Sequence, residues 1–361
     1  MRRRLFAALR LSTPILALLA AFAAAGWGVG SASAQQKITL RMTTIVPEGT
    51  YLYTAFSKRF ADNVARLTAG RVEVTPYPPS VLAPPFEVYK AVEDGRADMG
   101  HAPPALIYQR DPTMALFSSF PGGLGIEATM HWLYQGGGLK LLEGHHREKL
   151  GLHPLVAGIA TTEIFAHAHK PLRTAEDLKG LKFRTLGMWA ELLRGFGAEP
   201  VATPTSEVST ALERKLIDAT KMAGPADNLQ MGLNKLAKYI MVPGAHLPGG
   251  YFTVFLKVDA WDRLPADARA QIETAARLTS FDSYLEKGKL DIDAMAEMRK
   301  GPNEVVQLDP RFIQQIKDAG RAWARAKAAE EKAKGNPWTE RVAEQVFQFQ
   351  DKWDANKDYR M

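Results

Sequence analysis

A strand–helix alternation that occurs twice along the chain is the feature that most constrains its fold. Residues 37–44 alternate apolar and polar side chains as a strand does, and residues 55–67 repeat apolar side chains at helical spacing. A strand at 71–75, a helix at 86–94 and a strand that begins at 97 follow. Strands and helices that alternate with short connections predict a parallel α/β sheet.

The second occurrence begins at residue 155, with an extended stretch to 169 and a capped turn at 174–178. Strands are then predicted at 181–185, 199–203 and 217–220, and helices at 188–195 and 206–215. This unit has its own beginning and end, so two lobes of similar size are expected.

The last hundred residues are predicted to be mainly helical. A helix opened by Pro265 runs to about residue 299; at about 1.5 Å per residue it would be about 50 Å long, enough to lie along both lobes. A strand at 304–308 and a helix at 312–334 follow. A final helix after Pro337 carries an apolar seam at spacings of four, three and four: Val342, Val346, Phe349 and Trp353. Spacing leaves open whether this seam packs on its own lobe or reaches another subunit.

The amino terminus has the three parts of a secretory signal peptide. Arginines at 2, 3, 4 and 10 precede an unbroken apolar run at 15–25, and small residues end at Ala34-Gln35. An uncleaved membrane anchor is the alternative, but the run of 11 residues is short of the roughly 20 that span a bilayer. We therefore predict a signal peptide at 1–34 and a soluble periplasmic protein after its removal.

Charge and composition exclude several classes of protein. The chain of 361 residues has no cysteine, which excludes a disulfide scaffold and a cysteine-ligated metal protein, and its 46% apolar content excludes disorder. Its net charge of +7 includes the four arginines of the leader; without them, 42 of the 46 basic residues remain against 39 acids, or +3. Without a basic run, this charge gives no support to nucleic-acid binding.

No catalytic motif is present in the sequence. A Gly-x-Ser-x-Gly elbow, a phosphate-binding loop and a His-Glu-x-x-His helix are all missing. His167 and His169 share one strand face but would need further ligands to hold a metal. His145 and His146 lie in a charged stretch and are predicted to be surface residues.

Several motifs resemble the solute-binding subunits of tripartite ATP-independent periplasmic (TRAP) transporters. The central one is Thr-Ala-Glu-Asp-Leu-Lys-Gly-Leu-Lys-Phe-Arg at 174–184, and 197–201, 207–212 and 217–220 follow at the family's spacing. Three further stretches resemble the branch that binds 2-oxo acids: 85–95, 132–138 and 243–249. The resemblance covers essentially the whole mature chain.

The resemblance implies an α/β, two-lobed periplasmic binding protein fold with a long helix spanning both lobes and a C-terminal helical extension. Lobe I is then expected at 37–158 plus about 250–285, lobe II at 159–249 plus about 286–335, and the C-terminal helix at 336–361. The implied function is capture of a small organic carboxylate, a 2-oxo acid or related monocarboxylate, in the cleft and delivery to the membrane permease, without covalent chemistry or a cofactor. The alternatives are an exported ligand-binding sensor component and an exported enzyme acting on a small carboxylate. A homodimer through the C-terminal helix is also implied.

In the resembling family, an Arg at the end of the Leu-Lys-Phe-Arg strand binds the ligand's carboxylate through two hydrogen bonds. The matching residue is Arg184. A guanidinium presents two parallel donors that fit two carboxylate oxygens. The alternative is a surface Arg on an edge strand.

The chain departs from the 2-oxo-acid branch where that branch holds a bridging cation with a Gln and a Glu-Trp pair. The matching positions here are Glu163 and Lys221-Met222. A protonated Lys cannot ligate a cation and repels one, so we predict that no metal binds. Lys221 would instead supply a fixed positive charge paired with Glu163; the alternative is that its side chain turns to solvent. Met222 in place of Trp removes a flat apolar wall, so the ligand set is expected to differ from simple 2-oxo acids.

Four further residues are weaker candidates for contact with the ligand. Tyr51, Tyr108 and Trp189 are aromatic residues with a polar atom near the expected cleft, and each could equally be core packing. His246 lies in a Gly/Pro-rich segment and would line the cleft or brace a turn.

Overall fold

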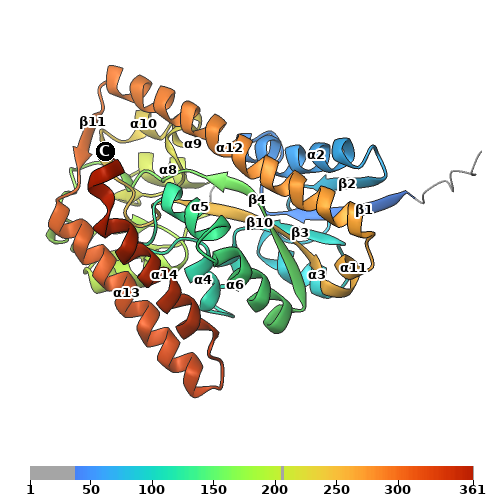
Figure 1. Ribbon diagram of the computed structural model, residues 1–361. Helices are drawn as coiled ribbons and strands as arrows, with labels where there is room; N and C mark the ends of the chain where they lie inside the picture. Colours follow the sequence, from blue (N-terminus) through green and yellow to red (C-terminus); the bar gives the residue numbers. More distant parts are fainter. Residues whose placement is uncertain (1–36, 205–206, 361) are drawn as a thin grey trace, which may run out of the picture. The chain divides into compact units, whose positions relative to one another are not determined.

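The computed structural model describes residues 37–204 and 207–360, so the predicted signal peptide lies outside the described residues. Two mixed β-sheets flanked by helices form the body of the chain (Figure 1). The α/β fold predicted from the sequence is confirmed.

The first sheet has the strand order β2-β1-β3-β10-β4. Its strands are β1 (Ile38–Thr44), β2 (Val72–Tyr77), β3 (Met99–Ala102), β4 (Leu152–Ala160) and β10 (Gly250–Lys257). The predicted parallel pairing is confirmed for β1 with β2 and β3. It is wrong for the rest of the sheet, because β10 lies antiparallel between β3 and β4. Residue 250 is far from β3 in sequence, so no local pattern revealed this insertion.

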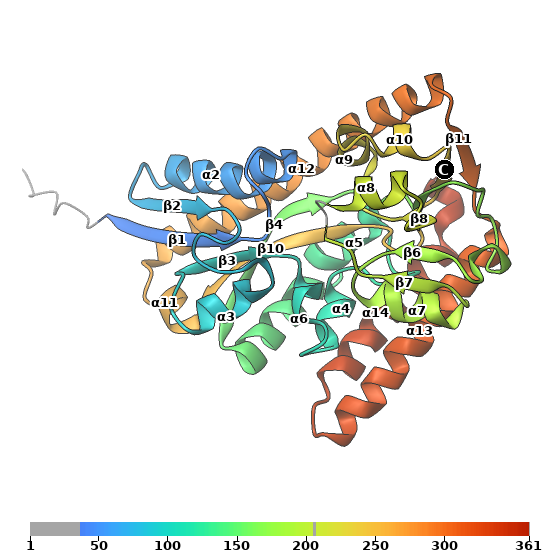
Figure 2. The ribbon, with the colours of Figure 1, turned by 180° about the vertical axis from the view of Figure 1, so that it is seen from behind.

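The second sheet has the strand order β11-β9-β5-β8-β6-β7. Its strands are β5 (Ala166–Ala168), β6 (Lys182–Arg184), β7 (Glu199–Val201), β8 (Ala219–Thr220), β9 (Tyr239–Val242) and β11 (Glu304–Gln307). Figure 2 shows β6, β7 and β8 beside α7 (Met188–Gly195) and α8 (Val208–Glu213). The chain crosses between the sheets after β4, and returns after β9.

Shorter helices pack around the two sheets. Those outside the predicted set are α4 (Thr113–Phe117), α5 (Ile126–Tyr134), α6 (Gly138–His145), α9 (Pro225–Gln230), α10 (Leu233–Leu236) and α11 (Val258–Asp262). The helices α2 (Arg59–Leu67) and α3 (Val88–Glu93) match predicted ones. None of the helices in the described part of the chain is both apolar enough and long enough to cross a bilayer.

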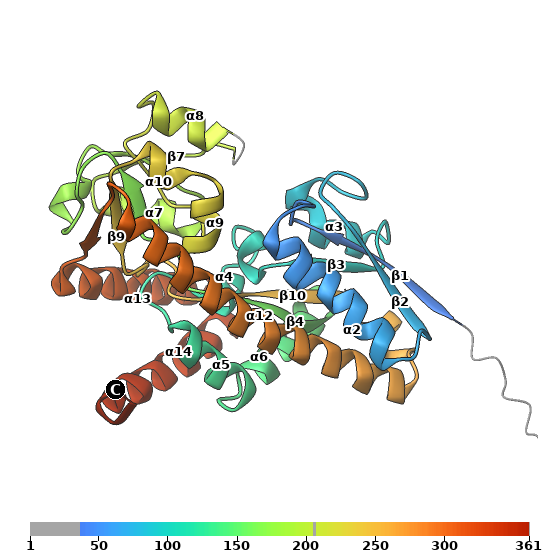
Figure 3. The ribbon, with the colours of Figure 1, turned by 90° about the horizontal axis from the view of Figure 1, so that it is seen from above.

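The predicted long helix is present as α12 (Ala266–Lys300). It packs on β4 and α2 beside the first sheet and on α9 beside the second, so it spans both lobes (Figure 3). The exact lobe boundaries given above stay predictions.

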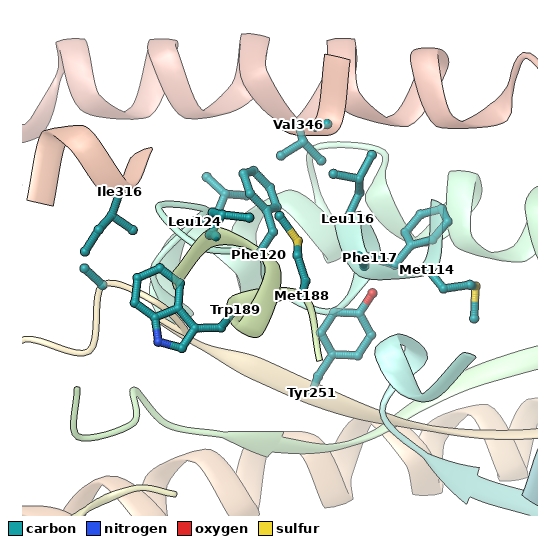
Figure 4. Close-up of a cluster of buried hydrophobic side chains, with 14 of the residues drawn as sticks. Met114, Leu116, Phe117, Phe120, Leu124, Met188, Trp189, Tyr251, Ile316 and Val346 are labelled. Atoms are coloured by element: carbon teal, nitrogen blue, oxygen red, sulfur yellow. The ribbon is translucent and has the colours of Figure 1, made fainter. Parts of the chain in front are cut away.

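The C-terminal extension is a helical hairpin of α13 (Pro310–Ala333) and α14 (Trp338–Ala355). The apolar seam of α14 packs on its own chain, against α13, α4, α5 and α6, and Val342 and Val346 are fully buried there. Figure 4 shows Val346 above the same apolar cluster that holds Phe117, Leu124 and Trp189. The seam is therefore covered within a single copy of the chain.

The prediction that His145 and His146 are surface residues is wrong, because both imidazoles are fully buried. Nε2 of His145 lies 2.9 Å from the carboxylate of Asp111, and Nδ1 of His146 lies 2.9 Å from the carbonyl oxygen of Leu142. The neighbouring Arg147 and Lys149 suggested exposure, but the two histidines lie on the inward side of the chain as α6 ends.

Candidate functional site

A cavity of about 530 Å³ is lined on one side by residues of β4 and β10 in the first sheet and on the other by residues 186–189 and 221–224, which follow β6 and β8 of the second sheet. Its walls are mainly apolar, with contributions from Leu106, Leu186 and Phe252 among others. Six of the eight predicted site residues line it: Tyr108, Glu163, Trp189, Lys221, Met222 and His246. The volume is in the range of small-molecule binding sites, and a mainly apolar wall with a few polar groups is also typical of such sites.

Three of these polar side chains form one hydrogen-bonded group. The ammonium of Lys221 donates to Oε2 of Glu163 at 2.9 Å, and Nε2 of His246 lies 3.0 Å from the same oxygen. Glu163 and His246 come from the two segments that cross between the sheets, and Lys221 follows β8 directly. The side chain of Lys221 is 15% exposed and that of Glu163 is 13% exposed, so both charges are largely removed from water.

Gly244 allows these two crossing segments to lie against each other. A Cβ added at Gly244 would stand 1.9 Å from the carbonyl oxygen of Glu163, closer than any side-chain carbon can approach. The backbone N–H of Glu163 also donates to the carbonyl of Leu247 at 3.3 Å. The close contact brings His246 within hydrogen-bond reach of Glu163, a role that sequence reasoning missed.

Burial and neighbouring charges shift the pKa values of Glu163 and His246. Burial alone would raise the pKa of Glu163, but the Lys221 ammonium and the hydrogen bond with His246 outweigh it and lower that pKa. Burial lowers the pKa of His246, and Glu163 offsets only part of that effect. The group therefore consists of an ionised carboxylate and a neutral imidazole at neutral pH, and in that state the imidazole donates its Nε2–H to Glu163.

Arg184 lies behind the cavity wall and is not among the lining residues. Arg184 as a whole is 3% exposed, and its guanidinium donates to the carbonyl of Thr203 at 3.0 and 2.8 Å and to that of Lys221 at 3.2 Å. A further N–H points to the sulfur of Met222 at 2.8 Å. These contacts use four of the five N–H groups of the guanidinium, so a two-bond contact with a ligand would require Arg184 to exchange partners. Burial lowers the pKa of Arg184, and the charge of Glu163 partly restores it.

The predicted aromatic residues occupy different places. The hydroxyl of Tyr108 donates to Glu191 at 3.3 Å, and the ring of Trp189 lies 5.8 Å from that of His246. Nε1 of Trp189 is buried and has no hydrogen-bond partner among the described residues, so a ligand oxygen could satisfy it. Tyr51 is not among the lining residues; Nζ of Lys287 lies 5.4 Å from the centre of its ring.

A second buried charge cluster lines the cavity and was missed from sequence. Lys287 of α12 forms ion pairs with Asp227 at 2.7 Å and with Asp291 at 3.1 Å, and its side chain is 2% exposed. Burial raises the pKa of Asp227 despite the Lys287 charge. Lys287 and Asp291 are four residues apart on a helix, a spacing that is usually found on exposed surfaces. The one sequence signal was that Lys287 and Asp291 lie on the same face of α12 as Ile272 and Ala276, which is its inward face.

The residues present do not fit a bound cation. The oxygen of Glu163 that would ligate one already accepts from Lys221 and His246, and the Lys221 ammonium would repel a positive ion. Within residues 37–204 and 207–360, no three His, Asp or Glu side chains converge as metal ligands would. The arrangement suits an anion placed next to Lys221.

Two lobes joined by crossing segments, with a cavity between the sheets, are the architecture of a cleft-type binding protein. The model of the bacterial extracellular solute-binding protein family 7 matches residues 42–331, and the chain belongs to this family of TRAP transporter receptors. Its members are extracytoplasmic solute receptors that work with membrane permease subunits.

Two curated relatives share most of the chain. The monocarboxylate 2-oxoacid-binding periplasmic protein of Nostoc sp. strain PCC 7120 is 31% identical over 279 residues, which are 76% of this chain and 75% of that protein. The C4-dicarboxylate-binding periplasmic protein of Rhodobacter capsulatus is 26% identical over 268 residues, covering 69% and 74%.

Solved structures share the fold. A TRAP solute-binding protein from Pseudoalteromonas atlantica with bound sodium and pyruvate has a TM-score of 0.80 at 24% identity, covering 90% of this chain and 97% of that one. One from Bordetella bronchiseptica, with calcium and picolinate, has a TM-score of 0.80 at 22% identity, covering 90% and 96%. At these identities, the likeness establishes the two-lobed architecture.

Proposed function

We propose that this protein captures a small organic carboxylate, a 2-oxo acid or related monocarboxylate, between its lobes and delivers it to a TRAP permease. The observation that carries the proposal is the ammonium of Lys221 in an otherwise largely apolar cavity. An anion with a small apolar body would pair its carboxylate with Lys221 and pack its carbon atoms on Met222 and Trp189.

Arg184 is proposed to act in two ways. In the state described, it ties the end of β6 to Thr203 and to Lys221, and so fixes the backbone on which Lys221 is carried. On ligand binding, the Arg184 guanidinium would redirect at least one N–H from a backbone carbonyl to the ligand's carboxylate. Tyr108, Trp189 and His246 are proposed to complete the contact surface, and Tyr51 to support Lys287 from behind.

The ligand is proposed to bind without a metal ion and without covalent chemistry. Lys221 holds the positive charge that a cation supplies in the sodium-bound and calcium-bound relatives. The chain would then act as a receptor and not as an enzyme, exported through the signal peptide at 1–34. A homodimer through the C-terminal helix stays a prediction, and it would require exchange of α14 between copies because its seam is covered in one chain.

A thermal-shift screen of the mature chain over small carboxylates, with and without EDTA, tests the proposal. A ligand at 100 times its Kd adds about 2.7 kcal/mol to the free energy of unfolding, enough to raise the melting temperature measurably. We expect a 2-oxo acid to give a shift that EDTA does not change. A shift that calcium restores after EDTA would refute the metal-free site, and a lack of response to every carboxylate would refute the ligand class.

A further inference from the structure

The second charged group that lines the cavity contains more acid than base. Nζ of Lys287 lies 2.7 Å from a carboxylate oxygen of Asp227 and 3.1 Å from one of Asp291. One ammonium therefore faces two carboxylates, and with all three ionised the group carries a net charge of −1. An ion pair that only joined α12 to α9 would need a single acid, so the second acid calls for another explanation.

The carboxylate of Asp291 is fully engaged within the chain. Its Oδ2 accepts from the hydroxyl of Thr161, and its Oδ1 accepts from the backbone N–H of Ala226 at 2.8 Å and pairs with Lys287. These contacts tie α12 to the end of β4 and to the start of α9, which Figure 3 shows beside α12. Asp291 therefore holds this wall of the cavity together, and both of its oxygens are in use.

Asp227 is the member of the group that faces the cavity. Its Oδ2 contacts Lys287, and no donor contacts its Oδ1 in the part of the chain that the structure describes. Its side chain is 17% exposed, whereas that of Asp291 is 11% and that of Lys287 is 2% exposed. Nζ of Lys287 is buried and lies 5.4 Å from the centre of the Tyr51 ring. The group therefore presents a carboxylate oxygen to the cavity and keeps its ammonium enclosed.

The negative charge of Asp227 is incompletely compensated. Burial raises its pKa, the Lys287 charge offsets only part of that effect, and the charges of Asp291 and Glu163 raise the pKa further. A cation placed against Oδ1 would remove this electrostatic cost. An apolar group in the same place would add to it, because it would exclude water from the carboxylate without giving it a partner.

The charged group around Lys221 has the opposite balance. Lys221 pairs with Glu163, and the Arg184 guanidinium lies behind the wall, where it is bonded to uncharged groups. Two cations against one acid give this group a net charge of +1, since His246 is neutral at neutral pH. Among the residues that the structure describes, no hydrogen bond or ion pair joins the two groups, so a ligand can contact both.

A buried donor beside the Lys221 group also lacks a partner. Trp189 is 3% exposed and lines the cavity, and its Nε1 has no hydrogen-bond partner within residues 37–204 and 207–360. Its ring lies 5.8 Å from that of His246, which bonds to Glu163. An oxygen of a carboxylate held by Lys221 would satisfy this donor. The carboxylate end of a ligand is therefore expected here and its other end near Asp227.

The cavity has more room than a short 2-oxo acid needs. A three-carbon 2-oxo acid has six heavy atoms, and at about 30 Å³ for each, the share of a water molecule in the liquid, it fills about 180 Å³. The cavity holds about 530 Å³. A ligand that contacts both charged groups would be longer, with its carbon atoms against the apolar wall.

We propose that the ligand is a zwitterion, a monocarboxylate whose far end carries an ammonium group that donates to Oδ1 of Asp227. This inference rests on the proposed function, because the carboxylate end is the one that pairs with Lys221. Asp227 is then a residue that determines specificity: it favours an ammonium and penalises every monocarboxylate that brings an apolar end against it.

Calorimetric titration of the mature chain with matched acids tests the proposal without any substitution. The amino acids γ-aminobutyrate, δ-aminovalerate and ε-aminocaproate are compared with butyrate, valerate and caproate, which have the same chain lengths. We expect the best amino acid to bind about 10- to 100-fold more tightly than its unsubstituted counterpart, because a hydrogen bond between charged groups is gained and a buried carboxylate finds a partner. The hydroxy acid of the same length should be intermediate, because its hydroxyl is a neutral donor.

Asp227→Asn tests whether Asp227 makes the contact. The substitution keeps the size of the side chain and removes its charge, so the ratio of the two affinities should fall to nearly one. Asp293→Asn is the matched control: it removes the same charge from the exposed side of α12, where Asp293 pairs with Lys289 at 2.5 Å, and the ratio should persist. Circular dichroism checks that both variants fold, and the comparison of ligands on the parent chain does not depend on either.

Three results would overturn this proposal and leave the proposed function in place. The first is equal affinity for the amino acid and its unsubstituted counterpart at every chain length, and the second is a hydroxy acid that binds as tightly as the amino acid. The third is an Asp227→Asn variant that keeps the full preference. A chain that binds no carboxylate of any kind would overturn both proposals together.

Discussion

Replacing Lys221 by Met tests the central electrostatic feature of the site. The substitution keeps most of the side-chain volume and removes the ammonium that lies 2.9 Å from Glu163. Loss of one partner from a fully buried ion pair costs about 3–5 kcal/mol. Because Glu163 is 13% exposed and can take up a proton, we expect about 2 kcal/mol of lost stability at pH 7.

Lys221→Met should reduce the free energy of ligand binding by more than it reduces the free energy of unfolding. A charged contact with a carboxylate in a closed cleft is worth about 2–5 kcal/mol, so affinity should fall about 30-fold to several-thousand-fold. Chemical denaturation and isothermal titration calorimetry measure the two effects, with the carboxylate that gives the largest thermal shift as the probe.

A second variant separates the two roles of Lys221. Adding Glu163→Gln to Lys221→Met removes the carboxylate that has lost its partner, so stability should return while affinity stays low. If the double variant binds the carboxylate as tightly as the parent chain, Lys221 does not hold the ligand and the proposed site is wrong.

Three further outcomes are expected. Arg184→Lys keeps the charge but loses the guanidinium that donates to Thr203, so the free energy of unfolding in denaturant titrations should fall by about 1–3 kcal/mol. An unchanged free energy of unfolding would contradict the hydrogen bonds described. Gly244→Ala should cost at least about 2 kcal/mol and weaken ligand binding because its Cβ meets Glu163, whereas Gly195→Ala, where a Cβ meets no atom within 4 Å, should be nearly neutral in the same assay. Stability should fall as the pH drops from about 6.5 towards 4, by about 1.4 kcal/mol per pH unit for each of His101, His146 and His167, because these side chains bind protons in the unfolded chain but not in the folded one. Melting curves across this range check the last prediction, and a flat profile would contradict it; burial lowers the pKa of His101 to about 4, His146 to about 3 and His167 to about 4.

The parts of the fold that depend on local patterns were predicted well. The bounds of α7 agree with the expected 188–195, and α12 begins one residue after Pro265. In both cases the apolar spacing and the terminating residues lie within the helix itself, so neighbouring sequence contains the information. The antiparallel strand β10 was missed because its place in the sheet depends on pairing with residues about 100 to 150 positions away.

The candidate site was only partly predictable for the same reason. Lys221 and Glu163 were singled out as departures from a family pattern, and the structure contains the ion pair that was suggested. Their contact with a ligand stays a prediction. The role of Gly244 was hidden because it depends on the approach of two crossing segments, which no spacing rule describes. The guanidinium of Arg184 donates to backbone carbonyls. Every residue type has a backbone carbonyl, so the sequence does not indicate which carbonyls an arginine will contact.

The tethered charge of Lys221 has a consequence for how the receptor responds to its surroundings. Where a free ion completes a site, the occupancy by ligand depends on the concentrations of both ligand and ion, because each stabilises the binding of the other. An ammonium that is part of the chain is present at a fixed stoichiometry, and dilution or chelators cannot remove it. Occupancy of this receptor would then follow the concentration of the carboxylate alone, so capture would proceed equally well in water of low and of high mineral content.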